Sequence, residues 1–345
     1  MSDLSIDLRK IRLKNPLICA SSEITMTAEG IRAALDAGAA AVIAKSVNEL
    51  PAAAAQLLKA DYILLDDNFH PLPWTSPDRL KASLFCRSGL AQAPLDEYLP
   101  MLAELDRYAQ TRQSYVVGSI TVAGAEPAAD IAARMQQAGL RWVELNLGAP
   151  HGRESAAVSQ ITAREAVRAY VRTVRRAVSV PLAVKLTAQA DDPLSLAATA
   201  INEGADMIVL TGRVQGFMPD IENHQPVLNS WGAIGGHWAL PASLYWVSKA
   251  WRNVSREVPM IGTNGARSAE DVIRFLLSGA CAVELASAVI TNGPNALSII
   301  IDELRSYCTR KQIARISELI GKAADAALTY DQISPKAVKE YPWKK

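Results

Sequence analysis

Two lysines end apolar runs of the chain, where a charged side chain can take part in chemistry. Lys45 closes the run 41–45 (AVIAK), and Lys185 closes the run 182–185 (LAVK). A lysine at the mouth of a buried sheet needs an anionic or electron-rich partner to offset its lost hydration. Two such lysines together predict a bound anionic ligand. The alternative is an internal salt bridge with a carboxylate of the same sheet.

A glycine-rich segment, 262–265 (GTNG), precedes a helix that we expect to begin near Ser268. Such a turn presents free backbone N–H groups, and the start of a helix adds positive potential, so that the segment suits a phosphate group. The alternative is a plain tight turn that Ser268 caps.

Asn146 ends another apolar run, 142–147 (WVELNL), and the loop 148–152 (GAPHG) follows it. This is how a buried parallel strand presents a polar side chain at its carboxyl end before turning into a loop. His151 lies on that loop and titrates near neutral pH, which makes it our first candidate for a general acid or base. The alternative is a loop histidine exposed to water.

Cysteine and arginine follow other apolar runs. Cys86 and Arg87 end the run 83–87, and Cys86 is a second candidate for proton transfer or a small filler of the core. Arg153 and Arg213 suit a bidentate clamp on a substrate carboxylate. The alternative for both is an arginine on a surface loop.

The elements that must position these residues alternate between short apolar runs and amphipathic helical patterns. Eight strand–helix units in about 300 residues predict a (β/α)8 TIM barrel, whose chemistry lies at the carboxyl ends of its strands. A doubly wound open sheet is the alternative, but no G-x-G-x-x-G motif opens the first helix. The eight predicted strands are 16–21, 40–46, 115–121, 142–147, 182–187, 207–211, 259–262 and 282–285, and 83–86 is a candidate for a further strand.

The end of the chain continues beyond the barrel pattern. We predict a barrel domain over residues 1–312 and a C-terminal helical extension over 313–345, with an amphipathic helix at 313–327. Such an extension packs on the barrel or on a partner subunit, and barrels of this type frequently form homodimers.

Composition excludes several classes of protein. A net charge of +1 gives no field that would attract nucleic acid or an anionic membrane. The four cysteines form no C-x-x-C pair, so we expect no metal site. The N-terminus has no apolar signal core, and no apolar stretch reaches about twenty residues. We therefore expect a reduced, cytoplasmic protein.

Over residues 4–310 the chain resembles the dihydroorotate dehydrogenase family, which includes the pyrimidine-reducing domain of dihydropyrimidine dehydrogenase. The segments that carry the resemblance occur in the family's order and are 14–17 (KNPL), 20–21 (AS), 45–46 (KS), 146–150 (NLGAP), 184–186 (VKL), 235–236 (GG), 259–265 (PMIGTNG) and 268–271 (SAED). The resemblance implies an FMN-dependent oxidoreductase on a (β/α)8 barrel.

The resemblance also implies where the flavin lies. Lys185 would lie near the N1–C2=O edge of the flavin ring and stabilise negative charge on the reduced flavin. Backbone N–H groups at the 265 and 286–287 positions would bind the phosphate. The full set of implied cofactor-binding residues is Ala20, Ser21, Lys45, Ser119, Asn146, Lys185, Gly236, Gly265, Ala286 and Ser287.

The sequence departs from the family at the substrate. Family members carry a Cys or Ser base where this chain has Ala149, and such a base is worth about two to four orders of magnitude in rate. Cys86, His151 and Thr211 stand where asparagines that hold the pyrimidine are expected. Since sites built on hydrogen bonds discriminate steeply, we expect a substrate other than dihydroorotate. The predicted substrate-binding residues are Arg87, Arg153, Thr211 and Arg213.

The sequence thus predicts hydride transfer at flavin N5 on a small cyclic or conjugated substrate, with His151 or Cys86 as the proton carrier. The chain carries no nicotinamide fingerprint, so a separate electron donor or acceptor is expected. Three alternatives remain open at this point. They are a genuine dihydroorotate or dihydropyrimidine dehydrogenase with a relocated base, a non-redox phosphate-binding barrel, and a flavin-binding partner subunit. A tRNA dihydrouridine synthase has a similar loop, but the near-neutral charge and the short tail of this chain do not supply its basic RNA-binding module.

Overall fold

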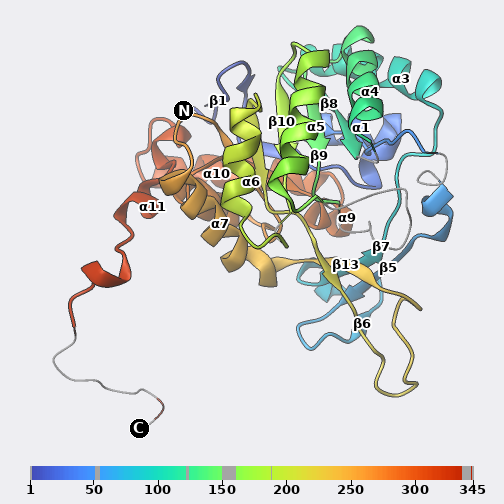
Figure 1. Cartoon of the computed structure of the whole chain (residues 1–345). Helices are drawn as coiled ribbons and strands as arrows, with labels where there is room; N and C mark the ends of the chain where they lie inside the picture. Colours follow the sequence, from blue (N-terminus) through green and yellow to red (C-terminus); the bar gives the residue numbers. More distant parts are fainter. Residues whose placement is uncertain are drawn as a thin grey trace.

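Eight parallel strands close into a barrel in the computed structural model, which describes residues 2–50, 55–121, 124–149, 161–187, 189–335 and 343 (Figure 1). Each strand pairs with the next barrel strand along the chain, and the last pairs with the first. The barrel strands are β3 (Leu17–Cys19), β4 (Ala41–Ile43), β8 (Tyr115–Thr121), β9 (Val143–Asn146), β10 (Leu182–Lys185), β11 (Met207–Leu210), β14 (Met260–Thr263) and β15 (Ala280–Leu285). The predicted (β/α)8 fold is confirmed.

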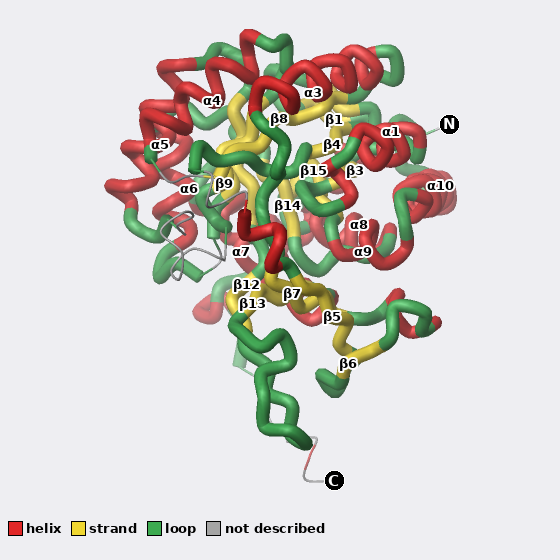
Figure 2. Tube along the Cα trace, turned by 90° about the vertical axis from the view of Figure 1, so that its right-hand side faces the viewer, coloured by secondary structure: helices red, strands yellow, loops and turns green. Residues whose placement is uncertain are grey.

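Helices surround the barrel and bury one apolar face against it (Figures 1 and 2). In α5, for example, Val167, Val171 and Val174 recur at helical spacing and are fully buried, whereas the arginines of the other face are solvated. The helices are α1 (Ala28–Asp36), α3 (Leu95–Gln110), α4 (Ala125–Gln137), α5 (Arg164–Ala177), α6 (Pro193–Asn202), α7 (Leu240–Asn253), α8 (Ala269–Leu277), α9 (Ser287–Asn292), α10 (Asn295–Arg310) and α11 (Lys322–Ala326).

A second sheet stands beside the mouth of the barrel (Figure 2). It is built from two excursions of the chain, one after β4 and one after β11. The residues predicted as a strand at 83–86 do form one, but it belongs to this sheet and not to the barrel. The strand order is β12 (Val214–Gly216), β13 (Gly232–Gly235), β7 (Ser83–Arg87), β5 (Asp61–Leu65) and β6 (Pro71–Leu72).

Antiparallel pairing of β7 with β13 joins the two excursions. Ala233 lies opposite Cys86, and Gly235 lies opposite Leu84. Ser88 follows β7 in the first excursion, and Arg213 begins the second excursion. The pairing of β7 with β13 therefore brings these two residues, which are distant in sequence, to the same edge of the barrel. A short hairpin of β1 (Ile6–Asp7) and β2 (Arg12–Leu13) precedes the barrel.

The single helix predicted at 313–327 is replaced by two shorter pieces. A 3-10 turn spans Ile316–Leu319, and α11 begins after Gly321, whose φ of 76° is left-handed and interrupts a helix. Both pieces pack on the barrel, since Ile316 and Leu319 are buried in the main core. The described residues beyond α11 extend away from the barrel (Figure 1).

Within the described residues, no helix is long and apolar enough to cross a membrane. No group of three or more His, Cys, Asp or Glu side chains in this part of the chain is arranged to hold a metal ion.

Candidate active site

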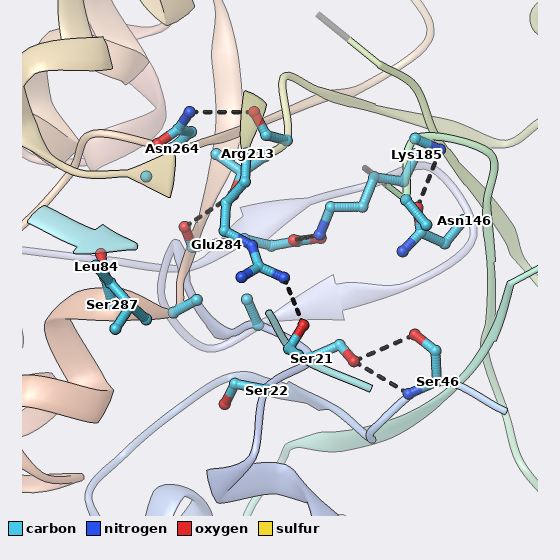
Figure 3. Close-up of a pocket in the computed structure, with 18 of the residues that line it drawn as sticks. Ser21, Ser22, Ser46, Leu84, Asn146, Lys185, Arg213, Asn264, Glu284 and Ser287 are labelled. Carbon is cyan, nitrogen blue, oxygen red and sulfur yellow. Dashed lines mark hydrogen bonds and ion pairs between the residues drawn. The ribbon is translucent and has the colours of Figure 1, made fainter. Parts of the chain in front are cut away.

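A cavity of about 1030 Å³, including the part that opens to solvent, lies at the carboxyl ends of the barrel strands and reaches the second sheet (Figure 3). Its lining includes most of the predicted cofactor-binding residues, namely Ala20, Ser21, Lys45, Asn146, Lys185, Gly265, Ala286 and Ser287. Of the other two, Ser119 lies behind the wall, and Gly236 lines a small neighbouring cavity. The strand ends thus converge where chemistry is expected in this fold.

Lys45 forms an ion pair at this cavity. Its Nζ lies 2.7 Å from Oε1 of Glu23, which also accepts a 2.7 Å hydrogen bond from the Tyr62 hydroxyl. Burial alone would raise the pKa of Glu23, but Lys45 and Tyr62 outweigh it and hold that pKa below its ordinary value. Glu23 is therefore ionised at neutral pH. A salt bridge is therefore present at Lys45, but its carboxylate follows β3 and does not belong to the barrel sheet, as the alternative had it.

Lys185 lies between two buried carboxylates, and we call Glu144, Lys185 and Glu284 the carboxylate–lysine cluster. The Nζ of Lys185 contacts Oε2 of Glu284 and lies 3.9 Å from Oε2 of Glu144. Burial and the neighbouring Glu144 raise the pKa of Glu284 to about 8, although Lys185 pulls it down. Burial would lower the pKa of Lys185, but the two carboxylates raise it. The cluster holds one cation between two groups that can each carry a negative charge.

A chain of serine hydroxyls connects the cavity to this cluster. Ser21 Oγ, on the cavity wall, lies 3.3 Å from Ser46 Oγ (Figure 3). Ser46 Oγ lies 2.8 Å from Ser119 Oγ. Ser119 Oγ in turn donates a 2.8 Å hydrogen bond to Oε1 of Glu144. Hydroxyls both donate and accept hydrogen bonds, so the chain is continuous from the cavity to the buried carboxylate.

The glycine-rich turn forms the opposite end of the cavity. Among the described residues, no hydrogen-bond acceptor is found for the backbone N–H of Gly265 or of Ser287. A side chain at Gly265 would place its Cβ 2.6 Å from the backbone of Leu240, at a φ of 113° that favours glycine. Ser268 caps α8 as the alternative proposed. The open N–H groups and the missing side chain fit a phosphate.

Arg213 reaches into the cavity from the start of the second excursion (Figure 3). Its guanidinium contacts Cys86 Sγ and donates a 3.1 Å hydrogen bond to Ser88 Oγ. Burial would lower the pKa of Arg213, but Cys86 and Glu23 raise it, so the guanidinium stays charged. Burial raises the pKa of the Cys86 thiol against the effect of Arg213. The thiol is neutral at neutral pH and lies outside the described lining.

The wall beside Asn146 is apolar where relatives carry a base. Ala149 and Leu90 form a small buried cluster, against which Leu50 packs. Asn146 Oδ1 accepts a 3.1 Å hydrogen bond from the backbone N–H of Gly148, which fixes the start of the loop. His151 and Arg153 lie outside the described residues, and their roles stay predictions.

Two predicted substrate-binding residues, Arg87 and Thr211, make their contacts outside the described cavity lining. Arg87 donates to the backbone carbonyls of Lys59 and Leu228, at 2.7 and 2.6 Å. Thr211 is buried, and its hydroxyl lies 3.2 Å from Ser243 Oγ. Neither belongs to the lining that the structure describes. Arg87 therefore ties loops together behind the cavity, and direct contact with a substrate stays a prediction for both.

Carboxylates are the residues that the sequence analysis missed. Glu144 and Glu284 each interrupt an apolar run, in VELN and AVEL, and such a charge inside a buried strand is itself a signal because it must be paired. Glu23 gave no comparable signal, since it follows a strand within a polar segment.

Comparison with known proteins gives matches along almost the whole chain. The family model described as dihydroorotate dehydrogenase matches residues 75–308. The relatives include proteins named "dihydroorotate dehydrogenase B (NAD(+)), catalytic subunit". That of Thermoplasma acidophilum is 27% identical over 94% of this chain and 99% of its own length. That of Methanosarcina mazei is 30% identical over 93% and 96%.

A solved structure agrees at the level of the fold. The structure of DHODH from Eimeria tenella in complex with ferulenol superposes with a TM-score of 0.74, at 18% identity, over 93% of this chain and 88% of that one. Members of the matched family are FMN-dependent oxidoreductases, which agrees with the phosphate cradle and the paired lysines. The chain therefore belongs to the dihydroorotate dehydrogenase family.

Proposed function

We propose that this chain interconverts a saturated and an unsaturated carbon–carbon bond in a small anionic ring, with dihydroorotate as the leading substrate. The observation that carries the proposal is the charged cavity wall facing the flavin cradle. Family membership sets aside the non-redox barrel, the tRNA-modifying enzyme and the inactive flavin-binding subunit.

The preference for dihydroorotate revises our expectation from the sequence. That expectation rested on the residues at positions 86, 149, 151 and 211, but the comparisons give it no support. The relatives that match over the whole chain carry the name dihydroorotate dehydrogenase B. The departures are therefore better treated as changes in how the ring is held and deprotonated.

The flavin supplies hydride transfer when it is bound, and the chain positions and polarises it. Lys185 and Ser21 fit the ring, while the open N–H groups of Gly265 and Ser287 fit the phosphate. With the ring at Lys185 and the phosphate at Gly265 and Ser287, the part of the cavity that Leu84 and Ser88 line would remain for the substrate.

Recognition of an anion follows from the charges on the described wall. Lys45, Lys185 and Arg213 line the cavity as cations, and Glu23 and Glu284 line it as acids. Arg213 stays charged although it is buried. A buried guanidinium is suited to hold a carboxylate by two parallel hydrogen bonds. Arg213 is accordingly the residue that we assign to the substrate carboxylate.

Proton transfer needs a group other than Ala149, and we assign it to Glu23. Lys45 and Tyr62 fix Oε1 of Glu23, and the carboxylate lines the cavity in its ionised form. In oxidation of the ring, a C–H bond breaks and its proton forms an O–H bond with Glu23. The electron pair left behind becomes the new C=C bond as hydride leaves the neighbouring carbon. His151 and Cys86 remain alternative carriers.

Electrons must pass to or from a second protein or a diffusible molecule. The names of the relatives call them catalytic subunits of NAD(+) enzymes, which supports a separate electron-transfer partner for this chain too. A homodimer and a cytoplasmic location stay predictions from the sequence.

The test mixes the flavin-loaded chain with dihydroorotate without oxygen. Reduction of the flavin is measured as loss of its visible absorbance. Changing Ala149→Cys restores the family base, so in a chain that has lost its own base through Glu23→Gln the rate should rise by about 10²-fold or more. Ala266→Cys, on the cavity wall near the phosphate end, controls for adding a thiol. If neither the native chain nor Ala149→Cys is bleached, the substrate is another ring. The apolar contact of Ala149 with Leu90 favours that second candidate, which a panel of unsaturated rings that reoxidise the reduced protein would identify.

A further inference from the structure

We propose that the carboxylate–lysine cluster is a proton-binding site whose occupancy follows the charge of the flavin, and that Glu284 carries the proton. The inference goes beyond hydride transfer. It rests on FMN binding but not on the identity of the substrate.

The first argument is the charge of the cluster. Glu144 and Glu284 are 0% and 2% exposed, and only Lys185 stands between them. Two ionised carboxylates would leave a net negative charge in the interior, which is costly. Moreover, Oε2 of Glu144 and Oε1 of Glu284 have no hydrogen-bond partner among the described residues. One added proton makes the cluster neutral and turns one of these acceptors into a donor.

The second argument decides which carboxylate holds the proton. Glu144 accepts a hydrogen bond from Ser119, which stabilises its ionised form. Glu284 lines the cavity, where a proton can reach it, whereas Glu144 lies behind the described lining. The contact with Lys185 favours the ionised form of Glu284, but burial and the charge of Glu144 outweigh it. The proton therefore resides on Glu284. The raised pKa of Glu284, about 8, agrees with this assignment.

The neighbouring groups do not compete for this proton. The Cys19 thiol, on the adjacent strand β3, has a pKa raised by burial to about 12 and stays neutral. Thr263, on β14, is directed to the backbone carbonyl of Glu284 at 3.4 Å. Within the cluster, Glu144, Lys185 and Glu284 act on one another. The charged and titratable groups that face the cluster from the surrounding elements are Cys19 and Arg213.

Coupling to the flavin has a definite sign. Reduction adds negative charge beside Lys185, and a nearby negative charge makes Glu284 bind its proton more tightly. Below about pH 8 Glu284 is protonated whether the flavin is oxidised or reduced, so reduction does not change the number of protons that the cluster binds. Above about pH 8 the oxidised protein has lost this proton and the reduced protein regains it. Reduction then consumes one proton more, which Glu284 takes up from the cavity that it lines.

The experiment is a redox titration of the FMN-loaded full chain at a series of pH values, read by flavin absorbance and without substrate. For a two-electron couple, a tenfold change in proton concentration per extra proton corresponds to about 30 mV. Above about pH 8 the midpoint potential of the native chain should fall by this amount per pH unit more steeply than that of Glu284→Gln. Asp302→Asn, an exposed carboxyl on α10, is the control and should keep the native slope. Equal slopes in the native chain and Glu284→Gln would overturn the proposal.

A second variant keeps the test decisive if Glu284→Gln does not fold. Ser119→Ala removes the donor to Glu144, which weakens ionisation of the pair and should move the onset of the extra slope to higher pH. An unchanged onset contradicts the proposal. In difference infrared spectra, reduction at high pH should create a carboxylic-acid carbonyl band that Glu284→Gln lacks, and its absence in the native chain contradicts the proposal.

The outcome is separable from that of the proposed substrate. A chain that shows the extra slope but is not bleached by dihydroorotate supports this inference and contradicts the substrate. A chain that takes up no FMN contradicts both.

Discussion

Since this chain has Ala149 where a Cys or Ser base is expected, another residue of the cavity lining must carry the proton, and we assign this role to Glu23. Ala149 is packed against Leu90, so a base there would have to be supplied from elsewhere. Glu23 is held by two donors on a single oxygen, which fixes its orientation and keeps it ionised. A base must be both positioned and unprotonated, and Glu23 meets both conditions.

Glu23→Gln removes the proton acceptor but keeps an amide oxygen for Lys45 and Tyr62. The rate of flavin reduction by the substrate should fall by about 10²- to 10⁴-fold at neutral pH. In the native chain the ionised form is active, so the rate should be lost as the pH falls through the lowered pKa of Glu23. Stopped-flow measurements across pH check both expectations.

The matched control for this change is Glu29→Gln, on the exposed face of α1. It should leave the rate unchanged. A rate in Glu23→Gln within about threefold of the native rate, well short of the loss expected for a missing base, would transfer the role to His151 or Cys86.

Among the elements, the turn after β14 and the helix that Ser268 caps were predictable from the glycines and the serine, and binding of a phosphate there stays a prediction. The antiparallel pairing of β7 with β13 was not predictable. These strands are short, far apart in sequence and separated by four strands of the barrel, so no local pattern reports their contact. Glu144 and Glu284, which flank Lys185, each interrupt an apolar strand and so were predictable as paired charges. Glu23, the partner of Lys45, lies in a polar segment after β3 and gives no such signal.

Gly265→Ala tests the cradle as an element. The added Cβ would meet the backbone of Leu240, so the loop must move and the N–H groups lose their alignment. We expect FMN binding to weaken by about 1–3 kcal/mol, or about 5- to 150-fold in Kd. Binding is measured by quenching of flavin fluorescence in the apoprotein.

Gly293→Ala separates strain from collision. Gly293 also has a positive φ, 73°, but a Cβ there meets nothing within 4 Å. This variant should bind FMN as the native chain does. Equal weakening in the two variants would mean that backbone strain and not the cradle geometry limits binding.

At the scale of the whole molecule, the barrel and the end of the chain share one core. We propose the division at residue 312 as a boundary in the pattern of the sequence, but Ile316 and Leu319 are buried against the barrel. Trp251 Nε1, on α7, also donates a 3.0 Å hydrogen bond to Asp325 of α11. The extension is therefore expected to support the barrel.

Deleting residues 313–345 should destabilise the fold. Loss of the two buried side chains alone corresponds to about 3–6 kcal/mol in the free energy of unfolding. Deleting only the segment from residue 328 onward removes exposed residues such as Leu328 and Tyr330 and should change little. Urea unfolding of the two truncated chains provides the measurement, and equal stabilities would show that the extension adds nothing.

The central claim, a flavin barrel that recognises a carboxylated ring, is tested most directly by comparing two rings that differ only in that carboxylate. The flavin-loaded chain is mixed without oxygen with dihydroorotate or with dihydrouracil, and loss of flavin absorbance is followed. The cationic wall around Arg213 predicts that dihydroorotate bleaches the flavin at concentrations at which dihydrouracil does not. Bleaching by dihydrouracil at an equal or higher rate would contradict the account.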